Sequence, residues 1–344
     1  MTMLRIKIML STICLFIVSP VLAQGQNGQP FQNLQDQIGN LQAQINAMQT
    51  DSSTAPINLE VDCNNGESIS GAIASVGGAL NRLNIEIAGE CTEQVFLSRS
   101  NVHLQGVSAD AGITGNYALF AVNGASNISV DSLTLDGGLA ALACLENSAV
   151  YGSNLVLENS GSGILAHSGG ACEIRDSILQ NNNQGMTIGT NGVVDAKGVI
   201  VQYSSGTAAN VYAGGSLTLN ASASGASLIR NNRYGLSIFA NGSLRPLSVV
   251  IEDNQSIGIN LFSGGALVMD SYTSGGLVVQ NNDGHGIIVQ PLSSASFLGQ
   301  VNLNNNEGMG LVCIGVHSAG GLENVLAAGN ANGDISGTCV FQPN

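Results

Sequence analysis

Four charged side chains recur at a single spacing and could together perform acid–base chemistry. Glu173 and Asp195 lie 22 residues apart, and Arg175 and Lys197 repeat that interval. Clustered carboxylates can bind Ca²⁺, and a basic side chain beside them can accept a proton. Strand alternation predicts that all four point outward on two neighbouring coils of a repeat. The alternative, which we favour, is a surface charge ladder in which each acid lies beside a base, an arrangement of little energetic consequence.

A second set of side chains could bind a ligand without reacting with it. Tyr212, Phe239 and Phe262 each follow an inward aliphatic residue and precede a turn that contains Gly. Aromatic rings at coil spacing on an outer face could receive sugar rings or a partner chain. Asn210 and Asn260 would flank this column. The alternative is an aromatic stack that stabilises the scaffold or lies beneath a loop.

A sequence repeat must position both sets. Between residues 157 and 312 the chain repeats an apolar residue, an Asn-containing turn, a Gly and an apolar strand, in steps of 21 to 29 residues. A period of this length with short strands indicates a solenoid. The repeated Asn positions are Asn159, Asn182, Asn232, Asn254, Asn282 and Asn306, with Tyr203 in the Asn place of a seventh, degenerate copy.

The repeat predicts an all-β fold, a right-handed parallel β-helix. Each Asn amide could bond to the Asn of the coils above and below, and the repeated Gly could supply a positive φ at a bend. We therefore interpret the Asn residues as structural. The predicted inward aliphatic positions are Ile164, Met186, Ile188, Leu236, Ile238, Ile259, Leu261, Ile287 and Val289.

The start of this region resembles a known family. Residues 61–73 read VDCNNGESISGAI and residues 85–107 read IEIAGECTEQVFLSRSNVHLQGV, and the Asn-turn coils follow. This pattern is similar to the secreted right-handed parallel β-helix proteins of the pectin-lyase-like superfamily, and the resemblance covers residues 57 to about 340. It implies the fold more than an activity, because the superfamily contains lyases, hydrolases, esterases, adhesins and proteins without a known reaction.

The resemblance implies two catalytic alternatives. Pectate-type lyases need clustered acids for Ca²⁺ and a base, and the charged cluster described above is the best such set in the sequence. Polygalacturonase-type hydrolases carry several aspartates and a Gly-His-Gly, of which the segment around His285 reproduces the last piece. A hydrolase needs two or three carboxylates around one bond, and no such set accompanies His285. We interpret His285 as another turn residue and expect no cofactor, with Ca²⁺ required only by a lyase.

The chain organisation places one long domain behind an export signal. A basic start, an apolar run and a small-residue cleavage site predict a signal peptide. Apolar residues in alternating steps of 3 and 4 predict a short coiled coil that could join copies of the chain, or else a single amphipathic helix or a disordered linker. A helix over residues 67–76 could cover the open end of the first coil. The predicted segments are 1–23 (signal), 24–30 (linker), 31–50 (coiled coil, with apolar positions in 31–48), 51–56 (linker) and 57–344 (β-helix).

Composition excludes some partners. Without Arg5 and Lys7 of the signal, seven of the nine basic residues remain against 23 acidic ones, so nucleic acid is not expected. No other apolar segment reaches membrane-spanning length. Trp is absent and aromatic residues make up 4% of the chain, which is few for a protein that binds sugars by stacking.

The cysteines agree with export. Cys14 lies in the signal, and the separations of the other six, paired in sequence, are 28, 28 and 26 residues, close to one coil. The segment around Cys144 also matches the segment around Cys172, as if one lay over the other. We expect disulfides and no metal site. The predicted pairs are Cys63–Cys91, Cys144–Cys172 and Cys313–Cys339.

These observations favour a non-catalytic binding or surface module. We expect it to be exported to the periplasm or the extracellular space and to contact a glycan or a protein through flat faces. The alternative is a polysaccharide lyase or glycoside hydrolase that acts on a uronate-containing polymer.

Overall fold

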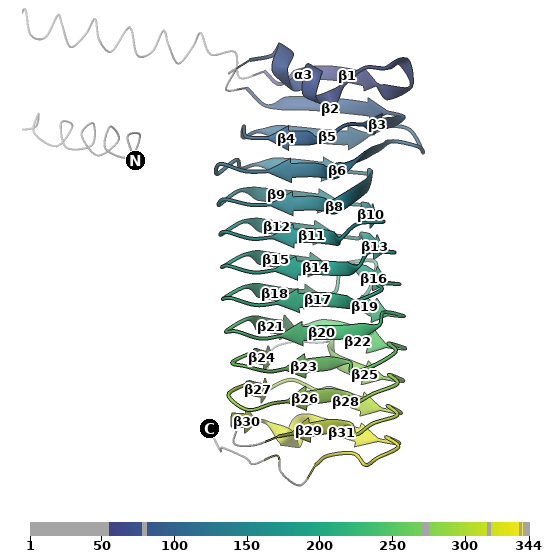
Figure 1. The fold of residues 1–344 in the computed structure, drawn as a ribbon, viewed down its shortest axis with the longest axis vertical. Coiled ribbons are helices and arrows are strands. Elements are labelled where there is room, and N and C mark those ends of the chain that lie inside the picture. The colour runs from purple at the N-terminus through teal and green to yellow at the C-terminus, as the bar shows by residue number, and fades with distance from the viewer. Residues whose placement is uncertain (1–54, 78–80, 270–274, 315–317, 337–338, 340–344) are drawn as a thin grey trace, which may run out of the picture. The chain divides into compact units, whose positions relative to one another are not determined.

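A computed structural model describes residues 55–77, 81–269, 275–314, 318–336 and 339. The predicted signal, the linker after it and the predicted coiled coil lie outside these residues, as does the oligomerisation assigned to residues 31–48. The described chain is an all-β parallel solenoid in which successive coils stack along one axis (Figure 1).

One side of the solenoid is sheet A, which contains twelve strands. All of its strand pairs are parallel, and each joins one coil to the next (Figure 1). In order, the strands are β1 (Ile57–Asp62), β2 (Leu83–Ala88), β5 (Val102–Gly106), β7 (Ile128–Asp131), β9 (Ala149–Ser153), β12 (Ala171–Arg175), β15 (Val193–Lys197), β18 (Ser216–Asn220), β21 (Ser243–Pro246), β24 (Ala266–Met269), β27 (Ser294–Phe297) and β30 (Ser318–Gly320).

Two further parallel ladders complete each coil, and the long strands β6 (Gly112–Ala121) and β8 (Thr134–Cys144) run through both. Ladder B also contains β3 (Glu90–Thr92), β10 (Val156–Glu158), β13 (Ile178–Gln180), β16 (Ile200–Gln202), β19 (Ser227–Arg230), β22 (Ser248–Glu252), β25 (Gly276–Gln280), β28 (Val301–Asn304) and β31 (Val325–Ala328). Ladder C also contains β4 (Val95–Leu97), β11 (Ser162–Ala166), β14 (Gln184–Ile188), β17 (Thr207–Val211), β20 (Tyr234–Ile238), β23 (Ile259–Leu261), β26 (Ile287–Val289) and β29 (Leu311–Cys313).

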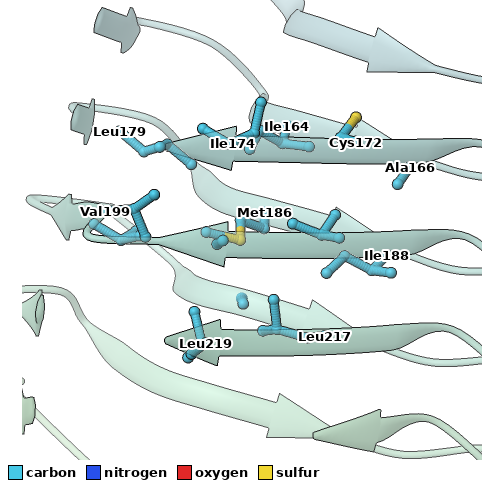
Figure 2. Packing of buried hydrophobic residues seen from close by; sticks show 14 of the residues in the cluster. Ile164, Ala166, Cys172, Ile174, Leu179, Met186, Ile188, Val199, Leu217 and Leu219 are labelled. Atoms are coloured by element: carbon cyan, nitrogen blue, oxygen red, sulfur yellow. The ribbon is translucent and has the colours of Figure 1, made fainter. Parts of the chain in front are cut away.

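Aliphatic columns fill the interior between the three sets of strands (Figure 2). All nine predicted inward residues are buried, with exposures of 0 or 1%. Ile164, Met186 and Ala209 occupy matching positions on successive coils, which shows how one column is built. Because each coil buries its apolar residues against its neighbours, stability depends on stacking rather than on any single coil.

Buried polar side chains form a continuous ladder at the turn between ladders B and C. Asn282 donates its amide to Oδ1 of Asn306 at 2.9 Å, and its own Oδ1 accepts from Asn254 at 2.9 Å. The same bonds link Asn232 to Asn254 and Asn306 to Asn330. The predicted Asn ladder is confirmed across these coils, and it extends one coil further than predicted.

The register of two predicted copies is wrong by one residue. Glu158 pairs with Gln180, so the position equivalent to Asn182 is Ser160 and not Asn159. Likewise Ser204, and not Tyr203, takes the ladder position, where its backbone N–H donates to Oδ1 of Asn232 at 2.9 Å. A small hydroxyl residue can replace Asn there, which the sequence pattern alone does not reveal.

The repeated Gly residues do not serve the purpose predicted for them. The positive φ in each turn belongs to the residue before the ladder position, such as Asn181 (φ 56°) or Asn281 (φ 54°). The Gly that follows is required by close approach: a Cβ on Gly235 would lie 2.0 Å from the carbonyl oxygen of Gly258 on the next coil. Asn tolerates the left-handed region, and so it can supply that turn conformation.

The predicted N-terminal helix is present in part as α3 (Ile69–Ser75). Ser68 caps it by accepting from the backbone N–H of Gly71, and the Glu93 carboxylate accepts from the backbone N–H of Ile69 at 2.7 Å. Ile69 is fully buried, while Ile73 packs against the core from a partly exposed position. Its role as a cap over the open end of the solenoid stays a prediction.

All three predicted disulfides are present. The Cα–Cα distance of Cys144 and Cys172 is 6.0 Å. The predicted overlay of their segments is wrong, however, because Cys144 pairs with Ala166 in ladder C and Cys172 with Val150 in sheet A. This disulfide therefore joins two different sheets.

Candidate functional site

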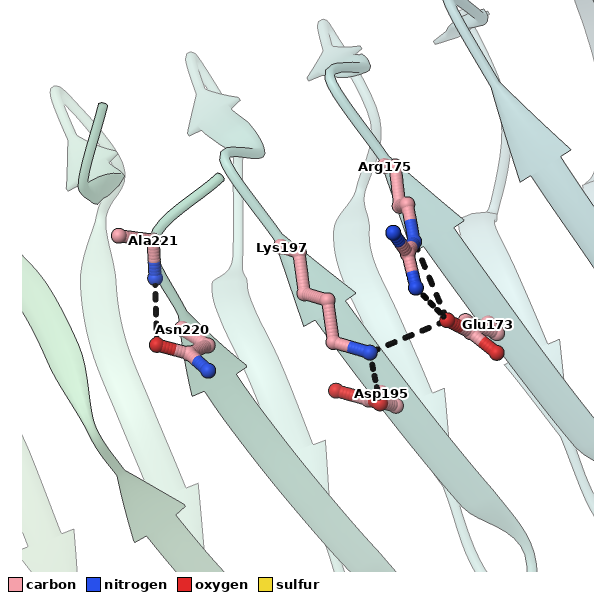
Figure 3. A network of polar contacts seen from close by, with 6 residues as sticks. All are labelled: Glu173, Arg175, Asp195, Lys197, Asn220 and Ala221. Atoms are coloured by element: carbon pink, nitrogen blue, oxygen red, sulfur yellow. Dashed lines mark hydrogen bonds and ion pairs between the residues drawn. The ribbon is translucent and has the colours of Figure 1, made fainter. Parts of the chain in front are cut away.

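The four charged residues come together on the outer face of sheet A, as predicted (Figure 3). The register places Glu173 beside Asp195 and Arg175 beside Lys197. Lys197 Nζ lies 2.7 Å from Asp195 Oδ2 and 3.0 Å from Glu173 Oε1, while Arg175 contacts Glu173 Oε1 at 2.6 Å. Every member of this set, called here the charge ladder, has an oppositely charged neighbour.

The charge ladder shifts pKa values away from those useful for acid–base catalysis. The hydrogen bond from Arg175 holds the pKa of Glu173 below its usual range. The hydrogen bond to Asp195 raises the pKa of Lys197. A lysine that accepts a proton near neutral pH needs a lowered pKa, and a carboxylic acid that donates one needs a raised pKa. Both shifts have the opposite sign.

A shallow depression of about 460 Å³ lies next to the charge ladder on sheet A. It contacts Glu173 and Tyr151 at one end and Arg82 at the other, across small side chains such as Ala149. The Arg175 guanidinium lies 5.6 Å from the centre of the Tyr151 ring. The turns beside it are short: residues 176 and 177 join β12 to β13.

The predicted aromatic column is present on ladder C as a parallel stack. Tyr212 and Phe239 have ring centroids 5.3 Å apart with planes 13° from parallel, and Phe239 and Phe262 are 4.7 Å apart at 10°. At the Tyr212 end, the ring lies over Gly189, where a Cβ would approach its ring atoms to 2.6 Å. The faces of Phe239 are both covered, so the column presents ring edges and not a flat platform for sugars.

A hollow of about 200 Å³ opens beside the last ring of this stack. Tyr234, Ser237, Asn260 and Phe262 combine aromatic, hydroxyl and amide groups at its surface. The hollow is smaller than the 300–1,000 Å³ of sites that enclose a drug-sized ligand. It can therefore hold one part of a larger ligand that continues across the face. The complete lining is Thr207, Tyr234, Leu236, Ser237, Ile257, Asn260 and Phe262.

Amide and hydroxyl groups form a row beside the aromatic stack. The register places Asn210, Ser237 and Asn260 on successive coils, as predicted for the two Asn residues. Asn210 donates to Gln184 Oε1 at 2.7 Å, and Asn260 accepts from Gln290 at 2.9 Å. Among the described residues, the Ser237 hydroxyl, the Asn210 carbonyl and the Asn260 amide hydrogens form no side-chain hydrogen bond, and so they are open to a ligand.

The structure gives His285 a role in the backbone of its turn. Its Nδ1 accepts a hydrogen bond from the backbone N–H of Met309 on the next coil at 2.8 Å. Within the part of the chain that the structure describes, no group of three His, Cys, Asp or Glu side chains could hold a metal ion. His285 thus lies apart from the charge ladder.

The sequence prediction missed Thr207 and Tyr234, which line the hollow from the first residues of β17 and β20, the strands that also carry Asn210 and Ser237. Tyr234 is 37% exposed, and the Arg233 guanidinium lies 5.3 Å from its ring centre. Each lies two residues before an inward residue of its strand, Ala209 in β17 and Leu236 in β20. An alignment of the coils by strand register, rather than by their Asn turns, could have placed them together.

Comparisons with known proteins identify no family. No family model and no curated protein matches the chain. Among solved structures, it is similar to the A-module of a mannuronan C-5 epimerase from Azotobacter vinelandii, with 12% identity and a TM-score of 0.45, over 80% of this chain and 93% of that one. Nothing about the chemistry of this chain follows from that likeness. In the described residues no helix is long and apolar enough to cross a membrane.

Proposed function

We propose that the chain is an exported, non-catalytic glycan-binding module of the pectin-lyase-like type, and that ladder C carries its binding face. Three disulfides agree with an oxidising compartment. The observation that carries the proposal is the hollow beside the aromatic stack, where Ser237 and Asn260 offer polar groups next to Tyr234 and Phe262. Sugars need this combination of apolar contact and hydrogen bonding.

The charge ladder supports a binding role over a catalytic one. Lys197 is held by two carboxylates and its pKa is raised, so it is not a general base. Glu173 is held by Arg175 and its pKa is lowered, so it is not a general acid. These contacts favour a function that rests on binding over one that rests on proton transfer at the charge ladder.

A glycan panel probed by affinity electrophoresis tests the proposal. The wild type should be retarded by at least one polysaccharide, and Tyr234→Ala combined with Asn260→Ala should abolish the retardation. Thr218→Ala is the matched control, because Thr218 points outward from sheet A with similar partial exposure. Binding that survives the double variant, or is lost in the control, would contradict the assignment of the face.

A polysaccharide lyase or hydrolase is the second candidate, favoured by the depression of about 460 Å³ that includes Glu173. A lyase would release unsaturated uronate products with ultraviolet absorbance from a uronate polymer, with or without added Ca²⁺. We expect no such absorbance. Uronate-dependent absorbance that disappears in Lys197→Ala would establish the enzyme instead.

We also propose that residues 31–48 join copies of the chain, on the strength of their apolar spacing alone. Light scattering of the chain lacking residues 1–23, with and without residues 31–48, tests this. A monomer in both cases would refute it.

A further inference from the structure

The outer face of ladder C is almost free of charge along its length. The chain has 23 acidic residues and a formal net charge of −14, yet the register column that includes the candidate row contains none of them. It also contains no Lys or Arg. From the first described strand of ladder C to the hollow, this column reads Phe96, Phe120, Ala143, Leu165, Thr187, Asn210, Ser237 and Asn260.

A second aromatic cluster occupies the other end of this column. Phe96 and Phe120 have ring centroids 5.0 Å apart with planes 58° from parallel, and Tyr117 lies 5.2 Å from Phe120. Phe96 is 49% exposed. Because these rings are tilted, they do not cover one another's faces as the Tyr212–Phe239–Phe262 stack does. This cluster can therefore offer ring faces to a sugar.

Polar groups occupy the half of this interval nearer the hollow, and the half nearer Phe120 holds the buried Ala143 and the partly exposed Leu165. The Ser162 and Thr187 hydroxyls lie 2.7 Å apart, Thr187 contacts Gln184 at 2.9 Å, and Gln184 accepts from Asn210. Five register steps separate Phe120 from Ser237, which at about 4.8 Å per strand gives roughly 24 Å. The face is thus an uncharged strip of aromatic, aliphatic, hydroxyl and amide groups parallel to the solenoid axis.

The charge distribution selects the ligand. An acidic polymer would bring carboxylates onto a strip that offers them no matching cations, on a protein of strongly negative net charge. Arg233 is the cation next to this face, and its guanidinium lies over the Tyr234 ring at 5.3 Å. One cation at one end cannot match a charge on every sugar.

We propose that the ligand is an uncharged glycan chain that lies along the solenoid axis from the hollow to the Phe96 cluster. This inference rests on the glycan-binding function proposed above. The hollow holds one sugar or its substituent, the Ser162–Thr187–Gln184–Asn210 network bonds the hydroxyls of the middle of the chain, and Phe96 and Phe120 contact its far end.

Calorimetric titration with short and long oligosaccharides of glucose, galactose and mannose, and with their uronate counterparts, tests the inference at low and high salt. A long neutral chain should bind with an affinity that salt does not change. Phe96→Ala should lower the affinity for long chains by about three- to tenfold, which corresponds to the loss of one aromatic contact. The affinity for short chains should not change. Tyr151→Ala on sheet A is the control and should leave neutral binding intact, because Tyr151 lies outside the strip.

The outcomes separate the two proposals. If no oligosaccharide of either kind binds, the glycan-binding function fails and this inference fails with it. If uronate chains bind more tightly than neutral chains and salt lowers their affinity, the glycan-binding function stands and the inference of an uncharged ligand is overturned. Equal affinity of wild type and Phe96→Ala for long chains, with thermal unfolding showing both to be folded, would also overturn it.

Discussion

At the scale of single residues, the same amide group serves two distinct purposes in this solenoid. The ladder Asn residues are buried and bond to the coils on both sides, whereas Asn210 and Asn260 lie on the outer face with groups to spare. Burial makes the difference, because an unsatisfied amide in the interior costs far more than one in water. The buried Asn ladder therefore stabilises the fold, and the outer row of Asn residues is the candidate for ligand binding.

Removal of one ladder amide should be costly. In Asn282→Ala, the backbone and amide donors of Asn254 lose their acceptor, and the Oδ1 of Asn306 keeps only the backbone N–H of residue 282. We expect the free energy of unfolding to fall by about 1–3 kcal/mol. Denaturant titration measures this, with Asn302→Ala on the outer side of β28 as the control. A loss no larger in Asn282→Ala than in the control would contradict the role of the ladder.

The charge ladder should contribute to stability only above the titration range of Glu173. Its pKa is lowered by the hydrogen bond from Arg175, so the folded state favours the carboxylate. The resulting stabilisation is present above the unfolded pKa of about 4.3 and is lost as pH falls through the folded pKa. Since the side chain is 38% exposed, solvent screening keeps it below about 1 kcal/mol.

Glu173→Gln tests this sign. The wild type should have a slightly higher thermal midpoint than the variant near neutral pH, and the difference should vanish in acid, where both side chains are uncharged. A difference that persists or grows in acid would contradict the assignment.

At the scale of strands and turns, parallel stacking converts one side chain per coil into a column. Tyr212, Phe239 and Phe262 directly follow β17, β20 and β23, and their rings meet because the strands are in register. Phe239 has a ring on each side, while Phe262 has one ring neighbour in the stack. The stack therefore stabilises the coils that carry the hollow.

Of the three stacked rings, the central one, Phe239, should contribute most to the stability of the fold. Each ring pair contributes about 0.5–1.5 kcal/mol beyond burial, so Phe239→Leu should cost about twice the aromatic increment of Phe262→Leu. Thermal or denaturant unfolding of the two single variants and the double variant measures the coupling. Equal losses with no coupling would show that the rings pack independently.

The sequence predicts the strands better than the turns. Inward residues such as Ile164 and Met186 follow from alternation, and the cysteine pairs follow from separations near one coil. The sequence does not predict which turn residue of each coil occupies the ladder position. Ser204 replaces Asn there, and because the coils differ in length, equivalent turn positions do not recur at a fixed spacing. The role of Gly235 depends on the proximity of the next coil's carbonyl, which no local pattern contains.

At the scale of the whole molecule, the solenoid separates two chemistries onto different sets of strands. Sheet A carries the charge ladder, and ladder C carries the neutral strip of aromatic and amide groups. The sequence predicts the members of the charge ladder and the aromatic column but not the hollow. Tyr234 and Thr207 enter it from a neighbouring column, and their proximity to Phe262 depends on the assembled coils.

Tyr151 and Tyr234 provide an internal comparison between the two faces. Each is 37% exposed, and each has an arginine guanidinium near its ring. Tyr151 lines the depression on sheet A, and Tyr234 lines the hollow on ladder C. Because the two rings match in exposure and in their arginine neighbour, a change in the reactivity of one but not the other locates a bound ligand.

Hydroxyl-radical footprinting with mass spectrometry, in the presence and absence of a bound glycan, is the most direct test of where this protein acts. We expect the ligand to slow the oxidation of Tyr234 and Phe262 and to leave the oxidation of Tyr151 unchanged. Protection of Tyr151 without protection of Tyr234 would contradict it and would place the functional site beside the charge ladder of sheet A.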